Sequence, residues 1–95
     1  MKKYEASRTQ KEVDDAYERI HTIIWFNRHK ATVRKGKPKH ISQKNWDAAV
    51  KQAKEVETKI PREELFLSDF EWGCVTGRFM MLNWLGGEDW DSAMT

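Results

Sequence analysis

The sequence has a single cysteine and no long apolar run. Cys74 is the one thiol among 95 residues, so the chain cannot form an internal disulfide. It has no apolar run long enough for a signal peptide or for a membrane span, so we expect neither. Both absences favour a reducing, cytoplasmic setting. Cys74 has no neighbouring base and lies in an apolar stretch, which predicts a buried structural thiol.

Disorder is excluded by the aromatic content. The chain is 39% hydrophobic and holds five Trp, four Phe and two Tyr, which is too apolar for an unfolded segment. At this length it forms one small domain over residues 1–95, and we expect its ends, 1–8 and 91–95, to be loose.

Periodicity predicts an all-α fold, a compact arrangement of three helices over roughly residues 9–31, 42–60 and 68–85. In the first helix the apolar residues recur at spacings of three and four, at Val13, Ala16, Tyr17, Ile20 and Ile24. Around Trp25 and Phe26 they extend beyond one stripe, so a second element must cover this end. A homodimer that closes around these two residues would supply such a cover.

Local signals set the other helix boundaries. Gly36 and Pro38 predict a basic loop over residues 32–40. Ser42 caps the second helix, which Pro61 ends, and residues 61–66 predict a short helical turn. Ser68 with Glu71 forms a capping box that starts the third helix, and two glycines end it after residue 85.

Gly73 and Gly77 lie inside the third predicted helix. Each costs about 1 kcal/mol of helix stability relative to alanine. We therefore expect a neighbouring helix to approach closely at both positions.

Positive charge is concentrated in the first half of the chain. No acidic residue occurs between Arg19 and Asp47, and residues 61–95 hold seven acids against two cations. Beside the cations, Trp25, Phe26 and His29 could stack on unpaired bases if their rings are exposed. The stretch Arg28–His40 is therefore a candidate nucleic-acid-binding segment through six cations, Arg28, Lys30, Arg34, Lys35, Lys37 and Lys39. A solvated loop is the competing interpretation.

Two weaker patterns resemble metal sites. Glu18 and His21 have the Glu-x-x-His spacing used in helical bundles, with His29 two turns further on. Clustered carboxylates can also hold magnesium in a small helical hydrolase, here Glu63, Glu64, Asp69 and Glu71. Helix-start roles explain the acids more simply. Neither Ser68 nor Cys74 has a base at a recognisable spacing, so we expect no catalytic residue, no metal and no cofactor.

The five tryptophans exceed what the core of three short helices needs. Tryptophan is a preferred anchor at protein interfaces. We therefore expect some aromatic residues to bind a partner protein, with Trp25, Phe26, Trp72 and Trp90 as the candidates.

The C-terminal quarter carries a recognisable pattern: Phe70-Glu71-Trp72-Gly73, Gly77, Leu82, Trp84-Leu85-Gly86, Glu88–Asp91 and Thr95. It resembles the ending of a set of small bacterial and phage proteins of unknown activity, except that Asn83 stands where those proteins often have arginine. The resemblance implies a phage or mobile-element origin. The resulting expectation is a non-catalytic protein that binds and modulates or inhibits a host protein or defence complex in the host cytoplasm.

Overall fold

The structure is a computed structural model that describes residues 8–91. It contains four helices, α1 (Gln10–Lys35), α2 (Gln43–Lys59), α3 (Arg62–Leu65) and α4 (Asp69–Leu85). Residues 8–91 include no strand, which confirms the all-α prediction. The termini predicted to be loose lie almost wholly outside the described residues.

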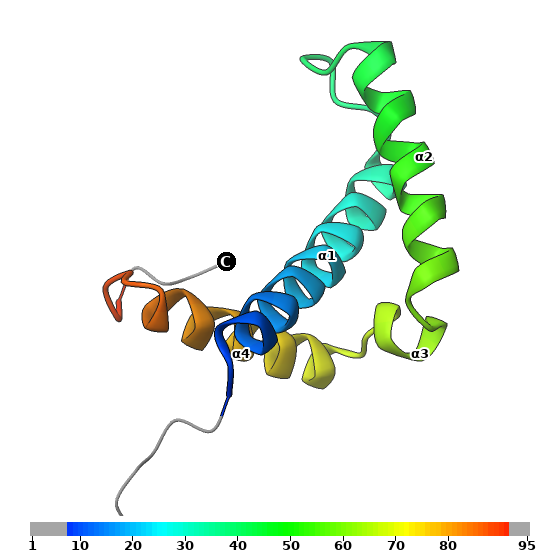
Figure 1. Cartoon of the computed structure of the whole chain (residues 1–95). Helices are drawn as coiled ribbons and strands as arrows, with labels where there is room; N and C mark the ends of the chain where they lie inside the picture. The colour runs from blue at the N-terminus through cyan, green and yellow to red at the C-terminus, as the bar shows by residue number, and fades with distance from the viewer. Residues whose placement is uncertain (1–7, 92–95) are drawn as a thin grey trace, which may run out of the picture.

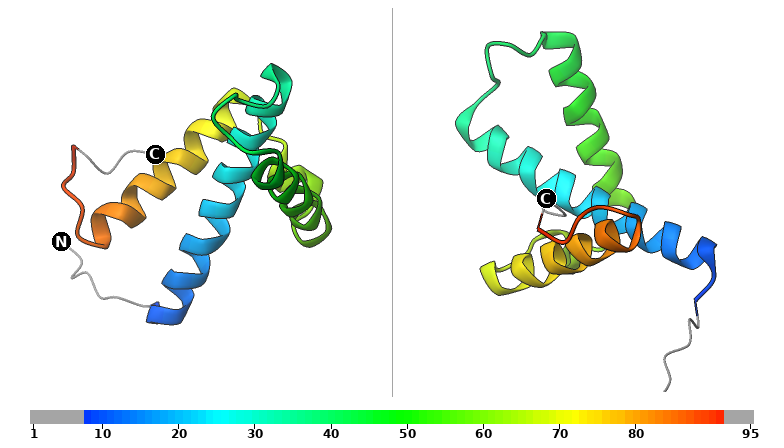
Figure 2. Two further views of the ribbon diagram at one scale, coloured as in Figure 1. Left: turned by 90° about the horizontal axis from the view of Figure 1, so that it is seen from above. Right: turned by 90° about the vertical axis from the view of Figure 1, so that its left-hand side faces the viewer.

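Helix α1 is the scaffold of the fold. Helices α2, α3 and α4 each pack on it, and Figure 2 shows α2 and α4 on different sides of α1. The molecule is elongated, with extents of 54 × 29 × 25 Å. In Figure 1, α2 lies along the C-terminal half of α1, while α4 crosses its N-terminal half.

The helix boundaries follow local capping chemistry. Thr9 accepts a hydrogen bond from the Glu12 amide at 3.2 Å, and the Glu12 carboxylate accepts one from the Thr9 amide. Ser68 and Glu71 form the same reciprocal pair, as predicted, at the start of α4. Ser42 caps α2. The short helix α3 confirms the turn predicted over 61–66.

The loop predicted over residues 32–40 is wrong in its first part. Helix α1 continues through Lys35 and ends at Gly36, whose φ of 91° lies in the left-handed region. Pro38 restricts only the residue before it, so nothing in 32–35 breaks the helix. Arg34 and Lys35 therefore lie in the last helical turn, where cations interact favourably with the helix dipole.

The core lies where α2, α3 and α4 meet α1. Phe26 and Leu65 are its most deeply buried large side chains. The buried residues come from every helix and consist of Ile23, Ile24, Phe26, Ala53, Val56, Ile60, Leu65, Val75 and Phe79. None of the helices described is both long and apolar enough to cross a bilayer.

Candidate interaction surfaces

The side of α4 that faces away from α1 is an exposed apolar face. Val75, Phe79 and Asn83 are the buried residues of this helix. On the opposite side of the helix, exposed apolar residues and glycines recur at spacings of three and four residues, as the residues of one helical face do. Together with the adjoining Leu85 and Trp90, this face is called the α4 surface below, and it consists of Phe70, Gly73, Gly77, Met81, Trp84, Leu85 and Trp90.

Large side chains on the α4 surface are in contact with water. Phe70 is 81% exposed and Leu85 64%, while Met81 and Trp84 are each more than two-fifths exposed. The charged residues of α4, which are Asp69, Glu71 and Arg78, fall outside the repeat. A helix that is apolar on all sides normally has all of its sides covered. Helix α4 has apolar residues on the side away from α1 as well as on its buried side, yet within this chain only the buried side is covered.

Trp90 extends the α4 surface beyond the end of the helix. Its ring meets that of Trp84 edge to face, with centroids 5.3 Å apart. This is a favoured aromatic geometry, so the turn after Gly86 places the two indoles side by side. Trp90 itself remains 62% exposed. Trp90 therefore folds back onto the end of α4 and keeps most of its surface in water.

The two glycines of α4 have no neighbour where one was expected. A Cβ placed on Gly73 or Gly77 would meet no atom within 4 Å. The predicted close approach of a neighbouring helix is therefore wrong within this chain. Both glycines leave an open, low strip in the middle of the α4 surface.

Sequence reasoning identified only part of this surface. Of the predicted partner residues, Trp90 is on the α4 surface, whereas Trp72 is half-buried against the core. Phe26 is fully buried and contacts the ring of Phe66 edge to face, so Phe26 belongs to the core and offers no surface to a partner. Phe70, Met81, Trp84 and Leu85 were missed. The available signal was that apolar residues occur all round residues 69–85.

A second surface lies at the opposite end, between α1 and α2. The rings of Trp25 and His29 stack with centroids 5.2 Å apart, and His29 meets Trp46 of α2 at 5.6 Å. With Arg28 and Thr32 these side chains line a shallow groove. We call this set the aromatic groove.

Burial and the neighbouring Lys30 ammonium both lower the pKa of His29, with burial the larger cause. His29 is therefore neutral at pH 7. A neutral imidazole between two indoles is suited to stacking rather than to ion pairing.

The structure distributes the six candidate cations over several positions. Arg28 lines the aromatic groove, whereas Lys30 lies 3.9 Å from Glu57 and over the ring of Phe26. Arg34 is on the other flank, beside Phe66. The Lys37 ammonium donates a hydrogen bond of 2.6 Å to the Ile41 carbonyl within the loop.

Lys35 and Lys39 are exposed, and no ion pair involves either of them in the part of the chain that the structure describes. The cations therefore do not form a single face.

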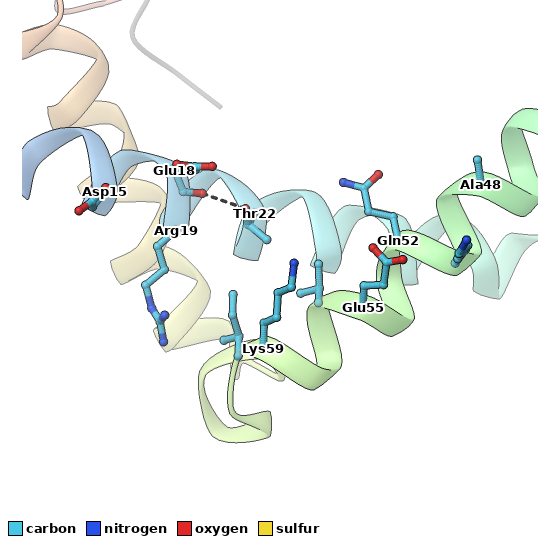
Figure 3. A pocket seen from close by; sticks show the side chains of 11 residues that line it. Asp15, Glu18, Arg19, Thr22, Ala48, Gln52, Glu55 and Lys59 are labelled. Atoms are coloured by element: carbon cyan, nitrogen blue, oxygen red, sulfur yellow. Dashed lines mark hydrogen bonds between the residues drawn. The ribbon is translucent and has the colours of Figure 1, made fainter. Parts of the chain in front are cut away.

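A further groove lies between the first half of α1 and the second half of α2 (Figure 3). Glu18 and Arg19 border it on one side, and Glu55 and Lys59 on the other. Charges of both signs alternate along its walls, and the Thr22 hydroxyl donates to the Glu18 carbonyl at 2.9 Å.

The predicted metal ligands do not converge. Glu18 lines the α1–α2 groove, whereas the His21 ring packs with Tyr17 and Phe79 on the side of α4. Across residues 8–91, no three His, Cys, Asp or Glu side chains come together as a metal-binding group.

Two of the four carboxylates proposed for magnesium, Glu64 and Glu71, have structural partners. The Glu71 carboxylate caps α4, and the hydrogen bond from the Ser68 amide is the main cause that lowers its pKa. Glu64 pairs with Arg19 of α1. Cys74 is half-buried rather than buried as predicted.

Comparison of the chain with protein-family models, with curated proteins and with solved structures finds no match in any of the three.

Proposed function

We propose that this chain is a non-catalytic protein-interaction module that docks a partner protein on the α4 surface. The observation that supports it is the exposure of Phe70, at 81%, on a helical face without charge. Isolated exposed apolar residues are ordinary on protein surfaces, but a contiguous patch usually marks an interaction site. Two tryptophans at one end of this patch supply the residue type most enriched among binding hot spots.

Modulation or inhibition of a host protein, which the C-terminal resemblance implies, stays a prediction within this proposal. The α4 surface provides the anchors for such binding. The acids around it, among them Glu88 and Asp91, can steer a basic partner during encounter.

The test is affinity capture with the tagged, full-length chain, before and after nuclease treatment. Both cellular proteins and untagged copies of the chain are offered as prey. The proposal predicts a protein that survives nuclease and is lost with Trp84→Asp. Val33→Asp is the matched control, because Val33 is 42% exposed on α1 and outside the α4 surface. Equal capture by both variants, or no captured protein, would contradict the proposal.

A second candidate function is binding of single-stranded nucleic acid at the aromatic groove. It is favoured by the neutral His29 between Trp25 and Trp46, beside the Arg28 guanidinium. Bases stack on aromatic rings while cations neutralise phosphates, so affinity should fall steeply with salt. Arg28→Glu combined with Trp25→Ala changes a cation and a ring of this groove and should abolish binding of a fluorescent oligonucleotide. Binding that survives this change excludes this candidate.

A further inference from the structure

We propose that the partner of the α4 surface is a second copy of this chain, with the two α4 helices antiparallel about a two-fold axis at Gly77. This inference rests on the proposed function, because it names the occupant of the same surface. A two-fold pair requires a self-complementary patch, in which each residue meets the counterpart of another.

The α4 surface has this symmetry. Phe70 and Trp84 lie seven residues before and after Gly77. At a rise of 1.5 Å per residue, each ring is about 10 Å from Gly77 along the helix. A two-fold axis through Gly77 therefore places Phe70 against the partner's Trp84, and the same contact occurs twice.

The remaining positions are also complementary in size. Gly73 and Met81 lie four residues on either side of Gly77, so Met81 packs over the partner's Gly73. A large side chain thus fills the space that a glycine leaves open, as close packing demands. The two glycines, which have no neighbour in one chain, obtain one in the pair.

The available area fits a small dimer. Phe70, Trp84 and Trp90 are 81%, 44% and 62% exposed. With about 200 Å² for each aromatic side chain, they expose about 370 Å² per chain. Met81 and Leu85 add to this, so two chains can bury roughly 1,000 Å², the size at which specific interfaces begin. We therefore expect a reversible dimer with a dissociation constant of order micromolar.

Disulfide trapping tests the register of this pairing in the full chain. In a Cys74→Ser background, Gly77→Cys puts the two thiols at the axis, within the Cα separation of about 4.4 to 6.8 Å that a disulfide needs. Gly73→Cys is the matched variant, and its thiols lie about 12 Å apart along the helices. We expect a covalent dimer from Gly77→Cys and none from Gly73→Cys. The reverse result would overturn the pairing.

Sedimentation velocity tests the association without cross-linking. The wild-type mass should rise from one chain to two between about 1 and 500 µM, a range that brackets a micromolar dissociation constant. Gly77→Leu should stay at one chain with unchanged helix content, because its side chain meets open space within the monomer. A one-chain mass for the wild type at every concentration overturns the inference. If Trp84→Asp then still abolishes capture of another protein, the proposed function stands without self-pairing. If Trp84→Asp leaves capture of another protein unaffected as well, both the self-pairing and the proposed function are wrong.

Discussion

The side-chain amide of Asn27 donates a hydrogen bond of 2.8 Å to the backbone carbonyl of Leu65. It joins α1 to α3 across 38 positions of sequence, next to a side chain that is only 1% exposed. Asn27→Ala leaves that carbonyl without its donor, so we expect a loss of about 1 to 2 kcal/mol in the free energy of unfolding. Urea titration measures the loss. Thr32→Ala removes an exposed hydrogen bond within α1 and should change stability little. Equal losses of stability from Asn27→Ala and Thr32→Ala would contradict the stabilising role of the Asn27 hydrogen bond.

Phe26 and Trp84 should separate stability from binding. Phe26→Ala opens a cavity in the core and should cost about 3 to 5 kcal/mol. Trp84→Ala should cost much less, because the ring is 44% exposed, yet it should reduce capture of the partner. Thermal unfolding followed by circular dichroism gives the first quantity. If Trp84→Ala lowered the free energy of unfolding more than Phe26→Ala does, the Trp84 ring would belong to the core.

Acid stability should depend on the two capping glutamates. Hydrogen bonds from the backbone amides of Thr9 and Ser68 are the main causes that lower the pKa of Glu12 and Glu71 below the ordinary value. A lowered folded-state pKa contributes stability that is complete above the unfolded pKa. It is lost as the pH falls from about 5 through the folded pKa.

The variant Glu12→Gln with Glu71→Gln should therefore show a flatter loss of stability on the acid side than the wild type. Urea midpoints measured between about pH 3 and 7 follow this range. Glu63→Gln is the control, since Glu63 caps no helix. An acid limb as steep as that of the wild type would exclude a capping contribution.

Gly77→Ala should act in opposite directions on the single chain and on the pair. Its added methyl group meets no atom in the monomer, so helix propensity alone should stabilise the dilute chain by about 1 kcal/mol. The same methyl group lies at the proposed axis and should weaken association. Melting at low concentration and sedimentation at high concentration give the two effects. If Gly77→Ala raised both the melting temperature and the strength of association, no second helix would approach Gly77.

The sequence was most informative where structure depends on local chemistry. Ser42 and Ser68 predicted the starts of α2 and α4, because a cap requires only a few neighbouring residues. The predicted start of the loop over residues 32–40 lies four residues before Gly36, where the structure shows that α1 ends. Gly36 and Pro38 were read as breaking the residues before them, whereas α1 stays helical until Gly36 itself.

Burial was harder to predict than helicity. The apolar residues around Trp25 and Phe26 indicated two covered sides, but not that α2 and α3 supply the cover. Helix α4 shows the same limit, because apolar residues on two opposite sides of a helix do not reveal which side the chain leaves open. Only the three-dimensional packing distinguishes Trp72, on the core side, from Trp84, on the exposed side.

The most direct test of the α4 surface is sedimentation equilibrium of the wild type, Phe70→Asp and Val33→Asp at matched concentrations. The account predicts a two-chain mass for the wild type and Val33→Asp at high concentration, and a one-chain mass for Phe70→Asp, because a charge on the apolar face opposes its burial. A two-chain mass for Phe70→Asp would place self-association elsewhere. A one-chain mass for all three proteins would contradict α4 pairing altogether.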